Sequence, residues 1–228
     1  MVAKRYLLNE SLDRIDKLLK GYQLDTADIE GGLSHIRYPI AVTKKYCMVV
    51  AKIDYHFVKR EPDFKGKVYS AAFNELYHIA RGTEQLCCFK ASGDRVVVIY
   101  DTPNKSDVDR VIDMVGNMCG IVDIINRKCR VTPINMGFAI RVAVNYGELT
   151  FLSYGEPRMN IVADNRLIEE TMGFFGASTD RVILSPIIWN NMKEDYQKFF
   201  HEVGVASLLY SGNIINTGMS NWLESQER

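Results

Sequence analysis

The chain has 228 residues, and its 28 lysines and arginines balance 28 aspartates and glutamates, so its formal net charge is zero. Hydrophobic residues make up 47% and charged residues 25%, a globular composition that excludes a disordered or fibrous chain. A zero net charge gives no support to non-specific nucleic-acid binding, which needs an excess of basic side chains. It leaves room for a small anionic ligand.

Nothing in the sequence predicts export or insertion into a membrane. The first twenty residues mix charges with Leu and Ile, so they lack the continuous apolar region of a signal peptide. No stretch approaches the roughly 20 apolar residues of a membrane helix. The five cysteines are odd in number and show no paired spacing, which is typical of reduced core residues. We therefore expect a cytoplasmic protein with no membrane partner.

The N-terminal third is expected to hold two helices and one buried strand. Residues 9–20 repeat apolar residues at helical spacing, and residues 21–45 are polar and interrupted by Gly and Pro. Residues 46–54 (YCMVVAKID) are rich in strand formers and predict a buried strand, followed by a polar loop. Residues 67–81 have helical periodicity and stop at Gly82.

A β-hairpin and a long helix are expected next. Residues 85–90 and 95–101 have the composition of strands, and the short segment between them contains Gly93 and Asp94, which are typical of a tight turn. Residues 105–128 repeat apolar side chains at intervals of three and four, which predicts a long helix with one apolar face.

The last part of the chain is predicted to alternate strands and helices: two strands within 138–153 around Tyr146-Gly147, a helix over 160–173, a strand over 181–185 and a helix over 186–192. Elements in this order indicate an α+β fold, in which helices cover one face of a mostly antiparallel sheet. We expect one domain over residues 46–228 and an N-terminal helical extension over residues 1–45.

Two aspartates are the strongest candidates for chemistry. Asp54 ends the predicted apolar strand, and Asp94 lies at the tip of the hairpin. If the strand lies beside the hairpin, their carboxylates converge at one edge of the sheet, and such hard oxygen ligands suit Mg²⁺ or Mn²⁺. Two such metals can activate a hydroxyl and stabilise a leaving phosphate. The residues alone also allow a purely structural interpretation, in which Asp54 caps the strand and Asp94 is a turn residue. Asp101, which ends the next strand, is a second candidate for the role of Asp94.

The order of these motifs resembles the catalytic domain of class III nucleotidyl cyclases over roughly residues 46–192. The strand VVAKID matches a family strand that ends in a metal-binding Asp, here Asp54, and Lys90-Ala-Ser-Gly-Asp94 matches the family's Lys-x-x-Gly-Asp hairpin. The segment RVAVNYG matches Arg-x-x-x-His-x-Gly, and Asn165 in VADNRLIEE matches a catalytic Asn on the next helix. The resemblance implies the ferredoxin-like cyclase fold.

The resemblance further implies a metal-dependent reaction on a nucleoside triphosphate. Asp54, Asp94 and the backbone carbonyl of Tyr55 would bind two divalent metal ions, Mn²⁺ or Mg²⁺, while the ribose 3′-hydroxyl attacks the α-phosphate and pyrophosphate leaves. The loop after Asp54, with Phe57, would contact the triphosphate. The family's active sites form at the subunit interface, so a homodimer is implied. In it Lys90 and the catalytic Asn would serve the partner subunit's metal site.

The base-binding side of the implied site departs from the family pattern. Tyr55-His-Phe-Val replaces Gly-Phe-Thr and adds bulk beside the nucleotide, and Arg158 occupies the position of a purine-selecting residue. An arginine cannot accept hydrogen bonds from an adenine amino group. In these departures the chain is similar to the stand-alone bacterial pyrimidine cyclases of Pycsar antiphage systems. The resemblance implies UTP, or else CTP, as substrate, and a cyclic nucleotide product that acts on a separate effector. Adenylate or guanylate cyclase activity is the alternative.

The phosphate-binding side departs as well. Glu169 occupies the position of a phosphate-contacting Arg, and Arg166 is the nearest substitute as a substrate-binding residue. Arg95 and Arg141 could reach phosphates or pair with surface carboxylates. The lost Arg leaves a catalytically inactive nucleotide-binding domain as an alternative, although both aspartates are retained. A diguanylate cyclase or polymerase-like enzyme is less favoured, because no Gly-Gly-Asp/Glu-Glu-Phe run is present.

Overall fold

The computed structural model describes residues 7–19, 41–57, 62–131, 136–152, 165–204 and 208–226. Its first half is a β-α-β-β-α-β unit that consists of β1 (Ala41–Phe57), α2 (Pro62–Ala80), β2 (Leu86–Ser92), β3 (Arg95–Tyr100), α3 (Lys105–Val131) and β4 (Met136–Leu152). These strands are antiparallel and lie in the order β2-β3-β1-β4, which is the ferredoxin-like arrangement. The predicted α+β fold class is confirmed.

The remaining elements extend this unit: α1 (Leu8–Leu19), α4 (Asn165–Gly173), the 3₁₀ turn η2 (Phe174–Gly176), β5 (Val182–Leu184), α5 (Pro186–Asn191), α6 (Glu194–Gln197), β6 (Phe200–Val203), β7 (Leu209–Gly212) and α7 (Thr217–Ser225). β5 pairs with β4 in parallel, and β7 and β6 follow in antiparallel pairs. The described sheet therefore has seven strands, in the order β2-β3-β1-β4-β5-β7-β6. Neither β6 and β7 nor α6 and α7 were expected from the sequence.

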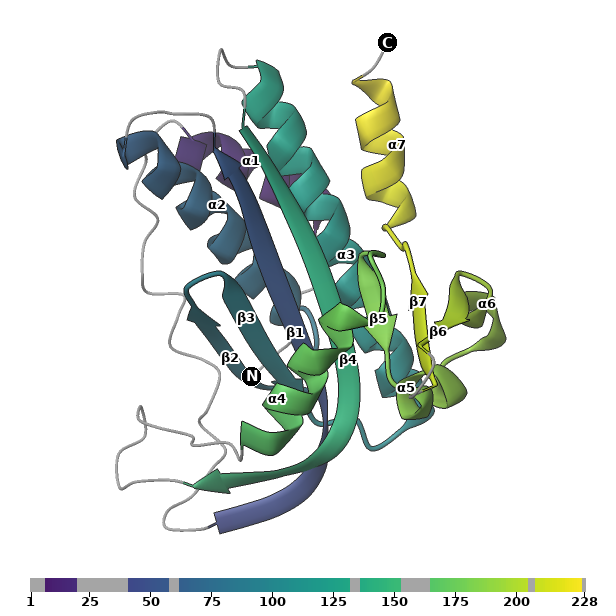
Figure 1. Ribbon diagram of the computed structural model, residues 1–228. Helices are drawn as coiled ribbons and strands as arrows, with labels where there is room; N and C mark the ends of the chain where they lie inside the picture. The colour runs from purple at the N-terminus through teal and green to yellow at the C-terminus, as the bar shows by residue number, and fades with distance from the viewer. Residues whose placement is uncertain are drawn as a thin grey trace.

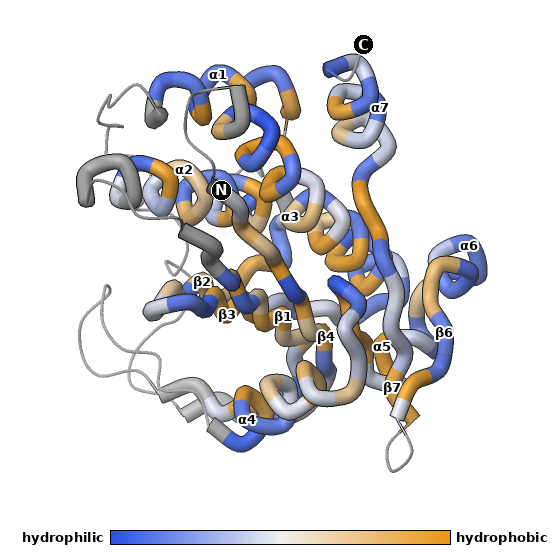
Figure 2. Tube along the Cα trace, turned by 45° about the horizontal axis from the view of Figure 1, so that its top comes forward, coloured by the Kyte–Doolittle hydropathy of each residue, from blue (hydrophilic) through white to orange (hydrophobic). Residues whose placement is uncertain are grey.

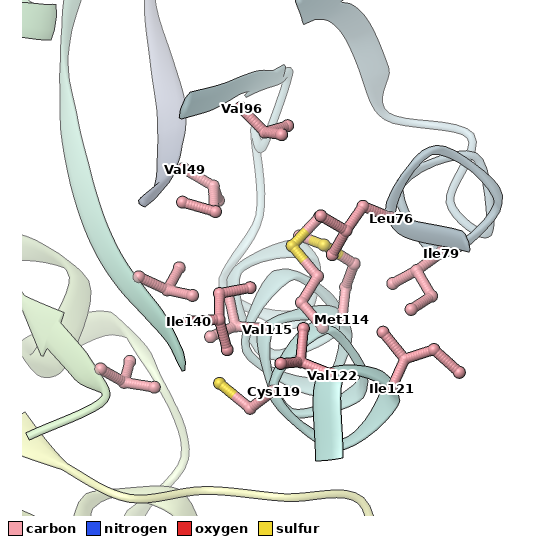
Figure 3. Packing of buried hydrophobic residues seen from close by; sticks show 14 of the residues in the cluster. Val49, Leu76, Ile79, Val96, Met114, Val115, Cys119, Ile121, Val122 and Ile140 are labelled. Atoms are coloured by element: carbon pink, nitrogen blue, oxygen red, sulfur yellow. The ribbon is translucent and has the colours of Figure 1, made fainter. Parts of the chain in front are cut away.

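The main core lies between one face of the sheet and the helices α1, α2 and α3 (Figures 1 and 2). Successive side chains of a strand point to opposite faces, so alternate residues of β1 enter this core: Val49, Ala51 and Ile53. Figure 3 shows Val49 of β1, Val96 of β3 and Ile140 of β4 near side chains of α2 and α3. The packing places the odd-numbered residues of this part of β1 on the helix-covered face.

The opposite face of the sheet is covered in part by α4, which lies on the other side of the strands from α1, α2 and α3 (Figure 2). Tyr46, Met48 and Val50 of β1 form a second buried cluster there with Leu167 of α4. The expectation that helices cover only one face is therefore incomplete. The even-numbered residues after Val50 continue this second face beyond the cluster, and we call this part the open face.

Three predicted boundaries are wrong. β1 begins at Ala41, five residues before the predicted start of this strand at residue 46. β1 also continues past Asp54 to Phe57, opposite Met136, where a loop was expected. Where two strands were expected around Gly147, the structure has one strand, β4, which runs through Gly147 to Leu152. β1 and β4 pair along their full lengths and form a continuous 17-residue ribbon.

Helix α1 is attached to the domain through an ion pair with α2. Arg14 Nε donates to Glu75 Oε1 at 2.8 Å, and the same guanidinium reaches Ser11 Oγ at 2.8 Å. The Glu75 side chain is fully buried, whereas that of Arg14 is 18% exposed. Burial raises the pKa of Glu75, and the hydrogen bonds from Arg14 and Ser11 oppose this rise.

We expect Arg14→Ala to destabilise the protein by about 3 kcal/mol, because it leaves the buried Glu75 carboxylate without a cation. Urea unfolding measures this loss, and Lys17→Ala serves as the control, since Lys17 is 59% exposed on the same helix. A carboxyl with a raised folded-state pKa holds its proton more tightly when folded, so its cost grows as the pH rises. The loss is therefore expected to be smaller at about pH 5 than at pH 8, and an equal loss for both variants would contradict the assignment.

Candidate active site

The tip of the β2–β3 hairpin lies beside β1. The β1–β3 pairing ends with Lys52 opposite Arg95, and one residue further Ile53 N–H donates to the carbonyl of Asp94 at 2.8 Å. The turn places Gly93 at a φ of 62°, a left-handed conformation that favours glycine. Asp54 and Asp94 therefore lie at the same end of the paired strands β1 and β3.

Asp54 projects from the open face. It lies one residue beyond Ile53, which enters the helix-covered core, so its side chain points the other way. The Asp54 and Asp94 side chains are 38% and 43% exposed. Asp54 Oδ1 lies 3.1 Å from Lys52 Nζ, and Asp94 Oδ1 lies 3.4 Å from Arg95 Nε. Both carboxylates are thus accessible, and each has a basic neighbour.

The backbone of Tyr55 also faces this end of the sheet. In an antiparallel strand the N–H and C=O groups of one residue point to the same side, and the side alternates along the chain. Because Ile53 N–H points towards the hairpin, the N–H and carbonyl of Tyr55 point there too, beyond the end of the β1–β3 pairing. The side chains of Tyr55 and Phe57 lie outside the described residues, as does Arg158.

Lys90 lies on the open face as well. It is paired with Val97 of β3, which packs against the second cluster, and directly opposite residues share a face of the sheet. The Lys90 side chain is exposed. Lys90 and Asp54 therefore occupy the same face of the sheet.

The start of α4 lies at the other end of this face. Leu167, two residues after Asn165, packs on Gly147 so closely that a Cβ there would lie 2.6 Å from Leu167 Cδ1. Gly147 is opposite Tyr46, eight residues before Asp54 on β1, which corresponds to about 26 Å. Within one chain the structure does not bring Asn165 and Arg166 to the two aspartates. The Asn165 side chain lies outside the described residues, and Arg166 is exposed.

Arg141 and Asp101 have other partners. Arg141 Nη2 donates to the carbonyls of Phe175, at 2.7 Å, and Ser178, and its guanidinium lies 5.3 Å from the Phe175 ring centre. This arginine holds the η2 turn. Asp101 accepts a hydrogen bond from Lys44 and follows the far end of β3, where Tyr100 is opposite Cys47. Its distance from Asp54 along the sheet favours Asp94 as the partner.

The donor set fits hard divalent cations. Among the described residues, no three His, Cys, Asp or Glu side chains gather as metal ligands, so a metal at Asp54 and Asp94 needs further oxygens. The Tyr55 carbonyl is one, and the phosphates of a bound nucleotide are others. Carboxylate, carbonyl and phosphate oxygens are the ligands that Mg²⁺ and Mn²⁺ prefer.

None of the described helices has the length and apolar character needed to cross a membrane.

Sequence reasoning missed Lys52, the basic residue nearest to Asp54. The signal was present in VVAKID, because a lysine inside an otherwise apolar strand must point away from the core. Its position two residues before Asp54 puts both side chains on one face.

The sequence matches no family model and no curated protein. Solved structures share its fold. The adenylyl cyclase CyaB of P. aeruginosa has a TM-score of 0.57 and 16% identity, over 77% of this chain and 98% of that one. The guanylyl cyclase Cya2 has a TM-score of 0.59 and 10% identity, over 78% and 95%. A class III adenylyl cyclase-like ATP-binding protein from Pseudomonas aeruginosa has a TM-score of 0.57 and 11% identity, over 96% and 48%. The chain thus has the fold of class III adenylyl and guanylyl cyclase domains.

Proposed function

We propose that the protein is a nucleotide cyclase, which converts a nucleoside triphosphate to its 3′,5′-cyclic monophosphate and pyrophosphate. The observation that carries the proposal is the placement of Asp54 and Asp94 at the same end of a cyclase-like sheet, where the N–H of Ile53, the residue before Asp54, donates to the carbonyl of Asp94 at 2.8 Å. A fold alone does not imply a reaction. The two accessible carboxylates supply the chemistry that the shared fold leaves open.

Asp54, Asp94 and the Tyr55 carbonyl would hold two divalent cations, Mn²⁺ or Mg²⁺. When bound, such cations acidify the ribose 3′-hydroxyl and neutralise charge on the reacting phosphates. The chain itself positions the substrate: the N–H groups of Tyr55 and Phe57 point towards the hairpin side of β1, where they can donate to phosphate oxygens. The 3′-oxygen then attacks the α-phosphorus, and the bond to pyrophosphate breaks.

The separation of the site residues supports a homodimer with shared active sites. The start of α4 packs near Tyr46, which precedes Asp54 by about 26 Å along β1, so Asn165 and Arg166 are too far away to act on the same triphosphate within one chain. A second copy in head-to-tail orientation would bring its α4 start to the carboxylates of the first. Each of two equivalent sites would then combine Asp54 and Asp94 of one protomer with Asn165 of its partner.

We propose UTP as the substrate and CTP as the second choice, on the departures at Tyr55 and Arg158. The purified protein is to be offered ATP, GTP, CTP and UTP with Mn²⁺, and the products identified by mass spectrometry. We expect cyclic UMP to form at least about tenfold faster than cyclic AMP, a difference of about 1.4 kcal/mol in activation free energy. Equal or faster turnover of ATP would contradict the pyrimidine assignment alone, and the absence of any cyclic product would contradict the cyclase.

The cyclic nucleotide is proposed to act as a second messenger in antiphage defence, by binding a separate effector in the cytoplasm. This role rests on the similarity to Pycsar pyrimidine cyclases described above. Its test is whether infection of cells that carry the gene raises the cyclic UMP level, measured by mass spectrometry of cell extracts.

A catalytically inactive nucleotide-binding domain is the second candidate. One specific observation favours it, since Glu169 occupies the position of the phosphate-contacting Arg and is exposed on α4. A structural neighbour described as an adenylyl cyclase-like ATP-binding protein shows that the fold also occurs in a protein named for binding. Nucleotide binding without a cyclic product from the wild-type protein would favour this candidate.

A further inference from the structure

Three basic side chains lie in one row across the open face. Lys52 of β1 is directly opposite Arg95 of β3 and directly opposite Arg141 of β4. Directly opposite residues of antiparallel strands share a face, with Cβ atoms about 5 Å apart, and like charges in such positions are destabilising. A row of this kind therefore requires counter-charges.

The positive charge of each side chain in the row is compensated by a different partner. The guanidinium of Arg141 is held by the carbonyls of Phe175 and Ser178. Lys52 pairs with Asp54 at 3.1 Å, and Arg95 pairs with Asp94 at 3.4 Å. Two of the three cations are thus neutralised by the same two carboxylates that we propose as metal ligands.

These two roles of the carboxylates compete. A carboxylate that binds a divalent cation no longer compensates a neighbouring ammonium or guanidinium group. Once Asp54 and Asp94 are engaged, Lys52 and Arg95 need another anion, and their side chains, 33% and 52% exposed, can be reached by one. At the same time the chain has Glu169 where the cyclase resemblance places a phosphate-contacting Arg. A phosphate-binding cation must therefore come from elsewhere.

We propose that Lys52 and Arg95 bind the non-reacting phosphates of the nucleotide, and that they exchange their carboxylate partners for phosphate oxygens when the metal ligands are engaged. This inference rests on the proposed function for the identity of the ligand. Without substrate, the aspartates prevent Lys52 and Arg95 from binding other anions, and these two cations lower the affinity of the aspartates for free metal ions. Substrate and metal thus favour each other's binding.

The test measures two affinities on Lys52→Met and Arg95→Met, with Mn²⁺ alone and with magnesium tripolyphosphate as probes in isothermal titration calorimetry. Removing the competing cation is expected to tighten Mn²⁺ binding about threefold. Removing a charge-assisted phosphate contact is expected to weaken tripolyphosphate binding about tenfold. Lys45→Met is the matched control, because Lys45 is an exposed lysine of the same strand, opposite Glu148, and lies on the other face.

In each variant, the affinity for Mn²⁺ and the affinity for tripolyphosphate must change in opposite directions. Affinities that are unchanged, or that both weaken as in a partly unfolded variant, would overturn the inference, as would a wild-type protein that binds neither probe. If wild-type protein forms a cyclic nucleotide while the variants bind both probes normally, the inference fails and the proposed function stands. If no nucleotide is cyclised but the opposite shifts are found, the cyclase proposal fails and the phosphate site stands.

Discussion

Asp54→Asn is expected to lower cyclic nucleotide formation at least about 10³-fold, because it removes one of the two carboxylates that we propose as metal ligands. A loss of this size corresponds to about 4 kcal/mol of transition-state stabilisation, which is within the range attributed to a metal in phosphoryl transfer. The amide keeps the shape of the side chain, and its ion pair with Lys52 is accessible to water, so the thermal midpoint is expected to change little. Steady-state assays at saturating Mn²⁺ and thermal unfolding measure the two effects.

Asp94→Asn tests the hairpin carboxylate, and Asp101→Asn is its matched control. Both aspartates flank β3, but Asp94 contacts β1 beside Asp54 through Ile53, whereas Asp101 lies at the opposite end and pairs with Lys44. Asp94→Asn is expected to lose activity as Asp54→Asn does, and Asp101→Asn is expected to stay within about threefold of wild type, as expected for loss of a surface ion pair. Equal losses at both positions would show that the hairpin tip has no special role.

The second large effect is expected from mixing two inactive variants. Asp54→Asn is defective at the carboxylate end of the face, and Asn165→Ala is defective at the α4 end. If the active sites combine the two ends from different subunits, half of the dimers in an equal mixture are mixed, and each has one intact site. Activity should therefore return to about a quarter of wild type, from near zero for either variant alone.

A mixture of Asp54→Asn with Asp94→Asn is the control for this complementation. Both substitutions affect the same end of the face, so no pairing restores an intact site and the mixture should stay inactive. Complementation is measured after the two proteins have been denatured and refolded together, which allows the subunits to exchange. Recovery in both mixtures, or in neither, would contradict sites that combine opposite ends of two chains.

The sequence was sufficient to predict the elements that bear the carboxylates. It was insufficient where tertiary packing determines whether a segment forms a strand or a turn. The apolar run before Asp54 and the turn at Gly93-Asp94 are local signals, and the structure places both elements as expected. The pair Tyr146-Gly147 predicts a turn, but Gly147 lies within β4, where Leu167 occupies the space above it. The strands FHEV and LYSG were missed because they are short and have no clear apolar alternation.

Residue roles were harder to predict than elements. The sequence allows Arg141 to bind phosphates or surface carboxylates, and only the fold shows that its guanidinium donates to the carbonyls of Phe175 and Ser178. The run VVAKID places Lys52 on the same face as Asp54, but the position of Lys52 opposite Arg95 and Arg141 comes from the register of three strands. No pattern within one strand contains this information.

The β1–β4 ribbon affects how the rate of cyclic nucleotide formation depends on the protein concentration. If each protomer carries half of an active site at either end of this ribbon, a lone protomer has two incomplete halves and no activity. Below the dissociation constant of the dimer, the rate then rises with the square of the protein concentration rather than in proportion to it. On the proposed function, dilution alone would lower the rate without any inhibitor, and the expression level would set whether cyclic nucleotide forms.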